Sequence, residues 1–312
     1  MITEPAEAGG RNVLQLLEIA APDDGGGGAP LMPAKGRSMI GRLTMVLAAL
    51  TLLSTQAAAG YEDVTFPSRA SDGVTLAAYL RRPADGKPAP AVVALHGCGG
   101  LFNRNGDMSG RHEDWAERFV AAGYVVLFPD SFGPRGVDSV CDTRERRIVP
   151  RERAADAVAA ADWLATQPFV DKERIAVLGW SNGGSSVLWA VGGAHKPETG
   201  EWRTAIAFYP GCRVPAESAK WAPRFKPYVL IGSADDWTPP EPCRRLAERN
   251  AVLLIEYPGA VHAFDTPNLA RRTRIGVAFS ARGDGSVEIG TDPKARAAAI
   301  KEVMTILDRA FR

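Results

Sequence analysis

Short apolar runs and longer amphipathic stretches alternate along most of this chain. Residues 91–95 read Ala-Val-Val-Ala-Leu, a continuously apolar run typical of a strand buried on both faces of a parallel sheet. Comparable strand signals recur at residues 124–128, 174–178, 204–208, 228–231 and 252–257. Helical patterns separate or follow these strands, at residues 113–122, 151–167, 182 onward, 240–250 and 293–311. Strands that alternate with helices in this way predict a single α/β domain with a mostly parallel sheet.

Weaker patterns flank this alternating region. Residues 64–66 and 74–80 are predicted to be two antiparallel strands joined by a turn at Ser71-Asp72-Gly73. Residues 266–292 match no regular element, so we expect a long surface loop there.

The first part of the chain differs in composition from the rest. Residues 1–38 contain the run Gly25-Gly26-Gly27-Gly28 and several prolines, and such a segment buries too little apolar surface to offset chain entropy. We therefore expect this extension to be disordered.

A secretory signal is predicted next. The basic residues Lys35, Arg37 and Arg42 precede the apolar residues 43–53, and small residues follow, which predicts cleavage after Ala59. An apolar stretch of eleven residues is well short of the roughly 20 needed to span a bilayer, so export is favoured over a membrane anchor.

The predicted organisation has two parts. Residues 1–59 hold the disordered extension and the secretory signal, and residues 60–312 form one domain. The late start of the signal makes Met39 an alternative to Met1 as the first residue. The processed protein is expected to be periplasmic or secreted, without a stable membrane anchor.

Composition and charge exclude several kinds of partner. Hydrophobic residues make up 46% of the chain and charged residues 23%, as in ordinary globular proteins. The chain has 37 Lys and Arg against 36 Asp and Glu, a formal net charge of +1, and no basic run interleaved with aromatic residues. Nucleic acid and acidic or lipid surfaces are therefore not expected as partners.

Cysteine and histidine usage bears on redox state and metal binding. An even number of cysteines, four, in an exported chain favours disulfides, with isolated buried thiols as the alternative. The four cysteines and four histidines show no paired ligand spacing, so no metal site is predicted.

The strand at residues 174–178 leads into the sequence Gly-Trp-Ser-Asn-Gly at residues 179–183. A chain that turns sharply from strand to helix needs minimal side chains two positions on either side of the turning residue, and Gly179 and Gly183 meet that need. The hydroxyl group of Ser181 would then project from the sheet beside a helix N-terminus, whose free N–H groups stabilise an oxyanion. Ser181 is therefore the predicted nucleophile.

A serine nucleophile needs a neighbouring base, and that base needs an orienting carboxylate. Among the four histidines, His262 follows the last predicted strand of the sheet. Loops at the carboxyl ends of parallel strands gather at one edge, the edge from which Ser181 projects. His262 is thus the predicted base, with a surface or capping histidine as the alternative.

Two carboxylates, Asp235 and Asp236, follow the predicted strand at residues 228–231. The order serine, aspartate, histidine along the chain is the one expected of α/β-hydrolases. Asp235 lies three residues after Gly232 and four before Pro239, and this spacing favours Asp235 as the orienting acid. Asp236 is then a neighbour or loop cap. Loop capping by both residues is the alternative.

An oxyanion site is predicted from the sequence His-Gly-Cys-Gly-Gly at residues 96–100, directly after an apolar strand. It resembles the His-Gly type of loop that supplies one backbone N–H, while the residue after the nucleophile supplies the other. Cys98 and Asn182 are the predicted donors, with Gly99 as a substitute for Cys98. A plain tight turn is the alternative interpretation of this loop.

Five segments together resemble the dienelactone hydrolase family of the α/β-hydrolases: residues 96–100, 130–136, 179–184, 228–239 and 257–264. The resemblance implies the α/β-hydrolase fold, a mostly parallel central sheet with helices on both faces in a three-layer sandwich. The founding activity of the family uses a cysteine at the elbow and a carboxylate that tunes it. This chain has Ser181 there and no acidic residue at 96–100, which favours a serine esterase of the same fold.

The resemblance also implies roles for other residues. Arginines bind anionic substrate groups in the family, so Arg135 is a candidate for that role, with hydrogen bonding to loop carbonyls as the alternative. Trp180 is a second candidate for contact with substrate.

In such a fold the strands that lead to Cys98 and Cys141 are neighbours, as are those that lead to Cys212 and Cys243. Two disulfides, Cys98–Cys141 and Cys212–Cys243, are therefore implied. The predicted function is hydrolysis of a small-molecule ester or lactone through an acyl-enzyme, without a cofactor. A peptidase or acyltransferase with the same triad, or a catalytically silent binding protein of this fold, are the alternatives.

Overall fold

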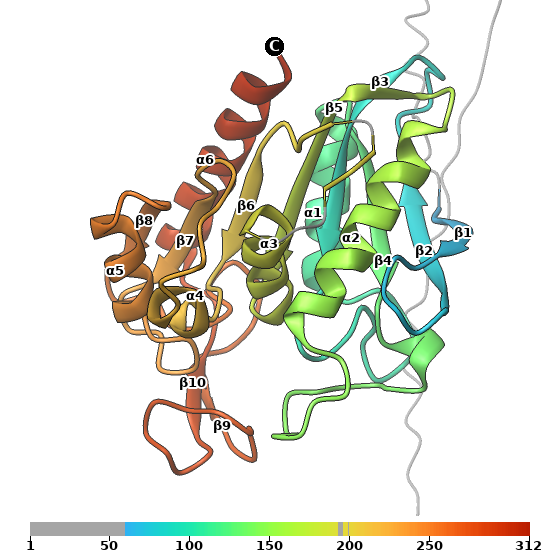
Figure 1. The fold of residues 1–312 in the computed structure, drawn as a ribbon. Coiled ribbons are helices and arrows are strands. Elements are labelled where there is room, and N and C mark those ends of the chain that lie inside the picture. Colours follow the sequence, from blue (N-terminus) through green and yellow to red (C-terminus); the bar gives the residue numbers. More distant parts are fainter. Residues whose placement is uncertain (1–59, 193–195, 199) are drawn as a thin grey trace, which may run out of the picture. The chain divides into compact units, whose positions relative to one another are not determined.

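A computed structural model of the chain describes residues 60–192, 196–198 and 200–312. The predicted disordered extension and secretory signal, residues 1–59, lie outside the described residues, as does His195. Figure 1 shows the described part of the chain as a ribbon coloured along the sequence.

The centre of the fold is a sheet of eight strands in the order β1-β2-β4-β3-β5-β6-β7-β8. β1 pairs antiparallel with β2 and β2 antiparallel with β4, while the pairs from β4 through β8 are all parallel. The strands are β1 (Glu62–Pro67), β2 (Thr75–Arg81), β3 (Ala89–Leu95), β4 (Val125–Asp130), β5 (Val170–Trp180), β6 (Ala205–Phe208), β7 (Tyr228–Gly232) and β8 (Leu253–Tyr257). This confirms the mostly parallel sheet and the antiparallel pair that precedes it.

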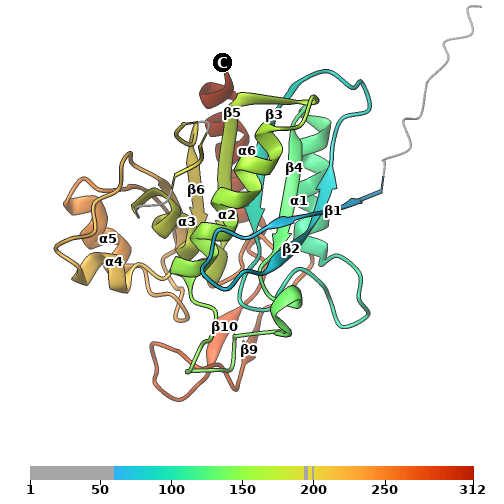
Figure 2. The same cartoon turned by 45° about the vertical axis from the view of Figure 1, so that its right-hand side comes forward.

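Helices cover both faces of this sheet, which confirms the three-layer α/β-hydrolase fold. α2 and α3 lie side by side on one face, and α1 and α6 lie on the other (Figures 1 and 2). The helices are α1 (Gly110–Ala121), the 3₁₀ turn η1 (Gly133–Arg135), α2 (Pro150–Ala165), α3 (Asn182–Gly192), α4 (Arg213–Glu217), α5 (Glu241–Glu248) and α6 (Pro293–Phe311).

The continuous apolar runs form the interior of the sheet because a strand covered on both faces exposes no side chain to water. In β3, every side chain from Ala91 to Leu95 is fully buried. Helix ends follow local chemistry: Gly123 follows α1 with φ +84°, and the Asp292 side chain accepts a hydrogen bond from the Ala295 N–H at 2.9 Å at the start of α6.

The prediction of a long surface loop at residues 266–292 holds for most of that segment, but it missed two short strands. The strands β9 (Arg272–Arg274) and β10 (Val287–Ile289) form a two-stranded antiparallel sheet, which lies below the main sheet in Figure 1. Val277, Val287 and Ile289 are buried together in a small cluster of their own. The sequence signal was missed because each strand has three residues, too few for an alternating pattern to emerge.

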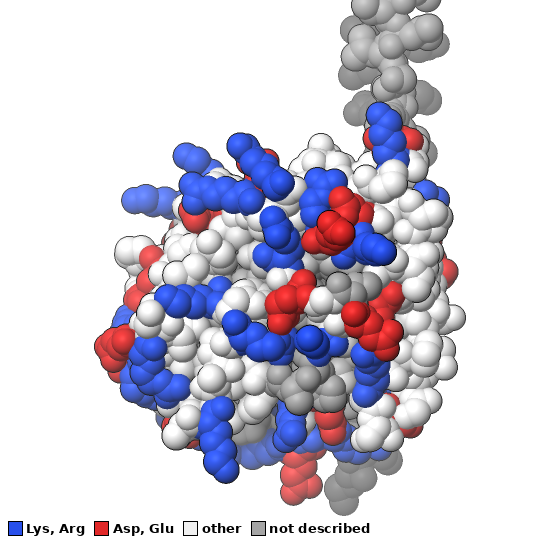
Figure 3. All heavy atoms as spheres, turned by 45° about the horizontal axis from the view of Figure 1, so that its top comes forward, with Lys and Arg blue, Asp and Glu red and all other residues white. Residues whose placement is uncertain are grey.

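The described surface carries both signs of charge. Basic and acidic side chains are interspersed on the face that Figure 3 shows, in keeping with the formal net charge of +1. In the part of the chain that the structure describes, no helix combines the length and the apolar character required to cross a membrane.

Candidate active site

Ser181 lies at a sharp turn between β5 and α3. Its backbone φ is +54°, a left-handed conformation that a residue with a side chain adopts only where the surroundings enforce it. A Cβ at Gly179 would lie 2.5 Å from the carbonyl carbon of Gly183, and a Cβ at Gly183 would lie 2.1 Å from the Leu95 carbonyl oxygen. Both glycines are therefore required by close backbone contact, which is what the sequence pattern predicted.

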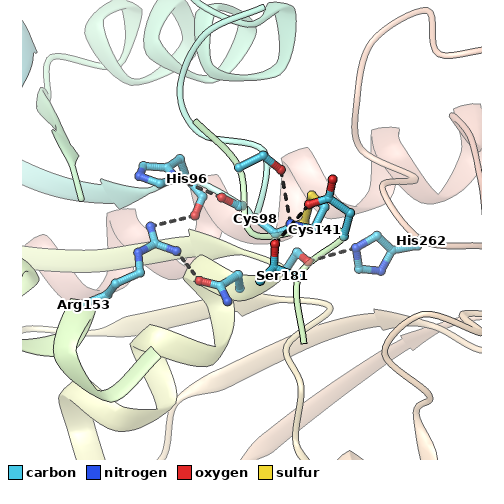
Figure 4. The surroundings of a disulfide bond; sticks show 11 residues. His96, Cys98, Cys141, Arg153, Ser181 and His262 are labelled. Atoms are coloured by element: carbon cyan, nitrogen blue, oxygen red, sulfur yellow. Dashed lines mark hydrogen bonds between the residues drawn. A yellow bond between two sulfur atoms is a disulfide. The ribbon is translucent and has the colours of Figure 1, made fainter. Parts of the chain in front are cut away.

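The structure brings Ser181, His262 and Asp235 together in one hydrogen-bonded series. The Ser181 Oγ lies 3.1 Å from His262 Nε2 (Figure 4). On the other side of the ring, His262 Nδ1 lies 2.8 Å from Asp235 Oδ2. The side chains of His262 and Asp235 are both buried. A buried carboxylate beside Nδ1 holds the imidazole with Nδ1 protonated, which leaves Nε2 as a proton acceptor that faces the serine hydroxyl.

Geometry separates the two candidate carboxylates. Asp235 Oδ1 accepts hydrogen bonds from the backbone N–H groups of Trp237 at 2.9 Å and Thr238 at 2.8 Å, which fixes the carboxylate toward His262. Asp236 turns away: its Oδ1 accepts from the Glu288 N–H at 2.8 Å. Asp236 thus anchors the segment that contains β9 and β10.

That segment is also fixed to the loop of the histidine. His262 forms an isolated parallel bridge with Ile289, and its carbonyl oxygen accepts from the Gly290 N–H at 3.2 Å. Since Asp236 binds Glu288 in the same segment, residues 287–290 connect the loop of the acid with the loop of the base.

The predicted oxyanion donors lie beside the nucleophile. Cys98, Ser181 and Asn182 line the same cavity, whose volume is about 830 Å³. The loop at residues 96–100 runs so close to the elbow that a Cβ at Gly97 would lie 3.7 Å from the Ser181 Cβ. Figure 4 shows Cys98 directly above Ser181.

Both predicted disulfides are present. Cys98 bonds to Cys141 and Cys212 to Cys243, with Cα–Cα separations of 5.0 and 5.1 Å. The first bond ties the loop of the predicted oxyanion donor to the segment before α2 (Figure 4). The second joins the start of α4 to α5, directly after the loop of Asp235.

The expectation that Trp180 contacts substrate was wrong. Its side chain is fully buried, and its Nε1 donates to Asp265 Oδ2 at 2.9 Å. Asp265 also accepts from Trp115 Nε1 at 2.9 Å and from the Tyr209 hydroxyl group at 2.5 Å. The Tyr209 ring in turn packs against the His262 ring, with centroids 4.5 Å apart. Sequence reasoning missed this buried carboxylate because its partners come from three distant segments.

Arg135 is not a substrate-binding residue in this structure, because its guanidinium is already occupied. It donates to both carboxylate oxygens of Asp156 at 2.9 Å, to Asp72 at 2.5 Å and to the Ser131 carbonyl oxygen at 2.8 Å. The alternative interpretation, that Arg135 holds its own loop, agrees with its hydrogen bond to the Ser131 carbonyl oxygen. The bonds to Asp72 and Asp156 fix the same side chain further.

Arg135 does not line the cavity, but other arginines do. The lining contains four of them, Arg144, Arg146, Arg151 and Arg213, and no Asp or Glu. Aromatic side chains contribute too, and the Arg146 guanidinium lies 4.8 Å from the centroid of the Phe279 ring. The arginine-rich run at residues 144–151 was the available sequence signal, but nothing in it indicated that these side chains share a cavity with Ser181.

Two other histidines are neutral core residues. Burial lowers the pKa of His112 to about 3, and its Nδ1 lies 2.8 Å from the Ser109 hydroxyl oxygen. Burial likewise lowers the pKa of His96 well below its ordinary value, and the nearby Arg153 guanidinium adds to the effect. Within the described residues, no group of three or more His, Cys, Asp or Glu side chains could hold a metal ion.

The sheet order and the elbow define this chain as an α/β-hydrolase. Residues 76–311 match the model of the dienelactone hydrolase family, so the chain belongs to that family. The fold is shared with solved structures of low sequence identity. An esterase 2 of Thermogutta terrifontis has a TM-score of 0.54 at 19% identity, covering 81% of this chain and 95% of that one. A Klebsiella pneumoniae protein assigned to the dienelactone hydrolases has a TM-score of 0.55 at 16% identity, covering 80% and 100%.

Curated relatives are peptidases by name. The probable dipeptidyl-aminopeptidase B of Emericella nidulans is 32% identical over 131 residues, which are 41% of this chain and 14% of that protein. Dipeptidyl-peptidase 5 of Porphyromonas gingivalis is 23% identical over 174 residues, which are 53% of this chain and 22% of that protein. The chain therefore matches only a minor part of the length of these relatives.

Proposed function

We propose that this member of the dienelactone hydrolase family is a serine hydrolase that cleaves a carboxylic ester or lactone through an acyl-enzyme. One observation carries the proposal. Ser181 lines the cavity, and its hydroxyl oxygen lies 3.1 Å from His262 Nε2. The other ring nitrogen of His262, Nδ1, lies 2.8 Å from Asp235. A nucleophile, a base and an orienting carboxylate in this order are the minimum set for acyl transfer.

The reaction follows from the geometry. Ser181 Oγ adds to the carbonyl carbon while His262 Nε2 takes the hydroxyl proton, and the carbonyl π electrons move to oxygen. The C–O bond to the leaving alcohol then breaks, and His262 returns the proton to that oxygen. Water repeats the sequence on the acyl-enzyme and frees Ser181. Asp235 stabilises the imidazolium that forms in each half. In a lactone, the leaving alcohol stays attached to the acyl group. Neither half requires a cofactor.

We assign stabilisation of the oxyanion to the backbone N–H groups of Cys98 and Asn182. Their place beside Ser181 in the cavity lining supports this assignment. Asn182 is the first residue of α3. Backbone N–H groups in the first turn of a helix have no partner within the helix, and together with the helix dipole they stabilise a nearby negative charge. Such donors act more strongly on the anionic intermediate than on the neutral carbonyl, so they lower the barrier.

The test is the Ser181→Ala variant. Turnover of p-nitrophenyl acetate should fall by roughly 10⁴-fold or more while the circular dichroism spectrum stays unchanged, because the nucleophile is lost and the fold is not. A fluorophosphonate probe should label the native protein at Ser181, as read by peptide mass spectrometry. The matched control is Ser185→Ala, in which a second serine of the same cavity is removed and labelling should persist. Retained turnover in Ser181→Ala would refute the assignment.

Peptide hydrolysis with the same residues is the second candidate, supported by the names of the relatives at 32% identity. A panel that pairs p-nitrophenyl esters with dipeptidyl p-nitroanilides separates the two. Faster cleavage of the anilides would make the chain a peptidase. Labelling without turnover of either class would favour an acyltransferase, and neither labelling nor turnover would leave a binding protein.

We further propose that the protein works outside the cytoplasm. Two disulfides in one domain support an oxidising compartment, because cytosolic reductants keep most thiols reduced. The expected partner is a small-molecule ester or lactone.

A further inference from the structure

Arg153 is a fully buried arginine on α2 that the reaction above does not use. Its hydrogen-bond partners are unusual for a buried guanidinium, because neither is a carboxylate. Nη2 donates to the His96 carbonyl oxygen at 2.8 Å, and Nη1 donates to Asn182 Oδ1 at 2.5 Å. Burial lowers the pKa of Arg153 to about 9, so the side chain is still charged at neutral pH.

Burying a charged group costs free energy unless its partners compensate. Asp156 and Asp130 act on Arg153 through their charge without a hydrogen bond to it, and Asp156 is itself bound to Arg135 at 2.9 Å. The Phe132 ring lies 5.0 Å below the guanidinium carbon and offers a weaker cation–π contact. An arrangement this costly points to a role beyond packing.

The two acceptors of Arg153 belong to the two segments that supply the proposed oxyanion donors. His96 opens the loop that contains Cys98, and Asn182 follows Ser181 in the elbow. These segments touch at this point, since a Cβ at Gly183 would lie 2.5 Å from the same His96 carbonyl oxygen that Arg153 binds. Figure 4 shows Arg153 on the opposite side of Ser181 from His262, bonded to His96.

The Asn182 side chain depends on this contact for its orientation. Its Nδ2 is buried and has no hydrogen-bond partner within the described residues, so the bond from Arg153 to Oδ1 is what fixes the amide. On the far side of the loop, Cys98 is held by its disulfide and by the Val140 N–H, which donates to the Cys98 carbonyl oxygen at 2.9 Å.

We propose that Arg153 is a positioning residue for the proposed ester hydrolysis: by bridging the His96 carbonyl and the Asn182 side chain, it holds both oxyanion donors at the distance that the anionic intermediate requires. The inference rests on the proposed function. It requires Arg153 to affect the transition state much more than substrate binding, because an oxyanion donor out of place weakens contact with the developing charge and leaves the ground-state complex intact.

The test compares Arg153→Met, Arg153→Lys and the matched control Arg81→Met. Arg81 is another buried arginine, the last residue of β2, and it is bound to Glu113 of α1; neither residue lines the cavity. Arg153→Met should lower kcat for p-nitrophenyl acetate by roughly 10- to 100-fold with KM within about threefold, and Arg153→Lys should recover part of the loss. Arg81→Met should lower the melting temperature and leave kcat within about twofold, since no group at the reaction centre is touched.

A second readout separates positioning from general damage. A trifluoromethyl ketone forms a hemiketal when Ser181 Oγ adds to its carbonyl carbon, which creates an oxyanion without turnover. Its inhibition constant should rise in Arg153→Met by the same factor as kcat falls, whereas that of the matching methyl ketone should not change. Equal shifts for both ketones, or a kcat within about twofold of the native protein, would overturn the inference.

Asn182→Ala supplies a further check in case Arg153→Met folds poorly. This variant keeps the backbone N–H and removes one partner of Arg153. Its effect on kcat and that of Arg153→Lys should combine to less than their product, because both act on the same bond. A strictly multiplicative double variant would contradict the inference. Failure of the proposed function itself is distinguishable, since the native protein would then show neither ester turnover nor trifluoromethyl ketone inhibition.

Discussion

At the scale of single residues, this site is built from side chains that the surrounding backbone leaves little freedom. Ser181 is held at φ +54° by two close glycine contacts, and Asp235 is fixed by two backbone N–H groups before it meets His262. Rigid placement of this kind lowers the reorganisation needed during reaction. It also makes the site intolerant of small changes: Gly183→Ala would drive a methyl group into the Leu95 carbonyl.

The buried histidines predict a pH dependence of stability. Folding lowers the pKa of His96 and His112, the latter to about 3, so between an unfolded pKa of about 6.5 and these folded values the unfolded chain binds more protons. Stability should therefore be fully present above pH 6.5 and fall on acidification by about 1.4 kcal/mol per pH unit for each histidine. Urea unfolding at pH 7 and pH 5 measures this loss.

The variant His112→Asn controls for other titrating groups. It removes one of the two histidines and keeps a donor that can reach the Leu101 carbonyl oxygen or Ser109. His96 and His112 together cause part of the loss of unfolding free energy between pH 7 and pH 5. About half of that part should disappear in the variant. An unchanged pH slope in this variant would show that His112 takes up its proton at the same pH in both states.

At the scale of elements, the two disulfides should stabilise the fold to a similar extent but affect the reaction differently. They close loops with sequence separations of 43 and 31 residues, so each should stabilise the fold by about 3 to 4 kcal/mol through the unfolded chain. Only Cys98–Cys141 holds a proposed oxyanion donor. Replacing this pair by serine should lower kcat at least about 10-fold, whereas replacing Cys212–Cys243 should have a smaller effect on kcat and a similar effect on the melting temperature.

The measurement is ester turnover of both double-serine variants below their melting temperatures. If the two variants lost kcat equally, the first disulfide would contribute to stability alone. Treatment of the native protein with a thiol reductant should reproduce the loss, and reoxidation should restore it, because the bond can reform in the folded chain.

The segment with β9 and β10 belongs to the candidate active site because of its tertiary contacts. Its residues 278–285 include lining residues of the cavity, and Asp236 and His262 both bind its other end. A stretch that resembles a surface loop in sequence is thus a wall of the site.

At the scale of the whole molecule, charge is balanced overall and unbalanced locally. The formal net charge is +1, yet the cavity beside Ser181 is lined by four arginines and no carboxylate. Arg146 Nε is buried there without a hydrogen-bond partner in the described structure. A cavity lined by one sign of charge attracts ligands of the other sign.

Esters that carry a carboxylate should therefore be preferred. The kcat/KM for an anionic monoester of a dicarboxylic acid should exceed that for the neutral diester of the same acid by roughly 10-fold at low salt, and the preference should shrink as salt is added. Arg146→Gln should reduce the preference, whereas Arg82→Gln, whose side chain pairs with Glu62 outside the cavity, should not. Equal kcat/KM values for the two esters in the native protein would contradict this prediction.

The sequence by itself determined the order of the strands of the main sheet and of the longer helices, the elbow at Ser181, the histidine and acid that follow later strands, and, through family resemblance, both disulfide pairs. These features depend on local periodicity, on glycine at enforced positions and on the rule that parallel strands end at one edge. Tertiary structure confirmed that Asp235, which the sequence only favoured, faces His262. It alone decided that Trp180 is buried, that Arg135 is bound to Asp72 and Asp156, and that Arg146 belongs to the cavity.

The reason is physical. A local pattern reports whether a side chain is buried, but its partner is set by the approach of segments far apart in sequence. Arg153 meets Asn182 across 29 residues and Tyr209 meets Asp265 across 56, and no periodicity in either segment encodes the other. Polar side chains in a core must find such partners or lose free energy, so their roles become visible only when the chain is folded.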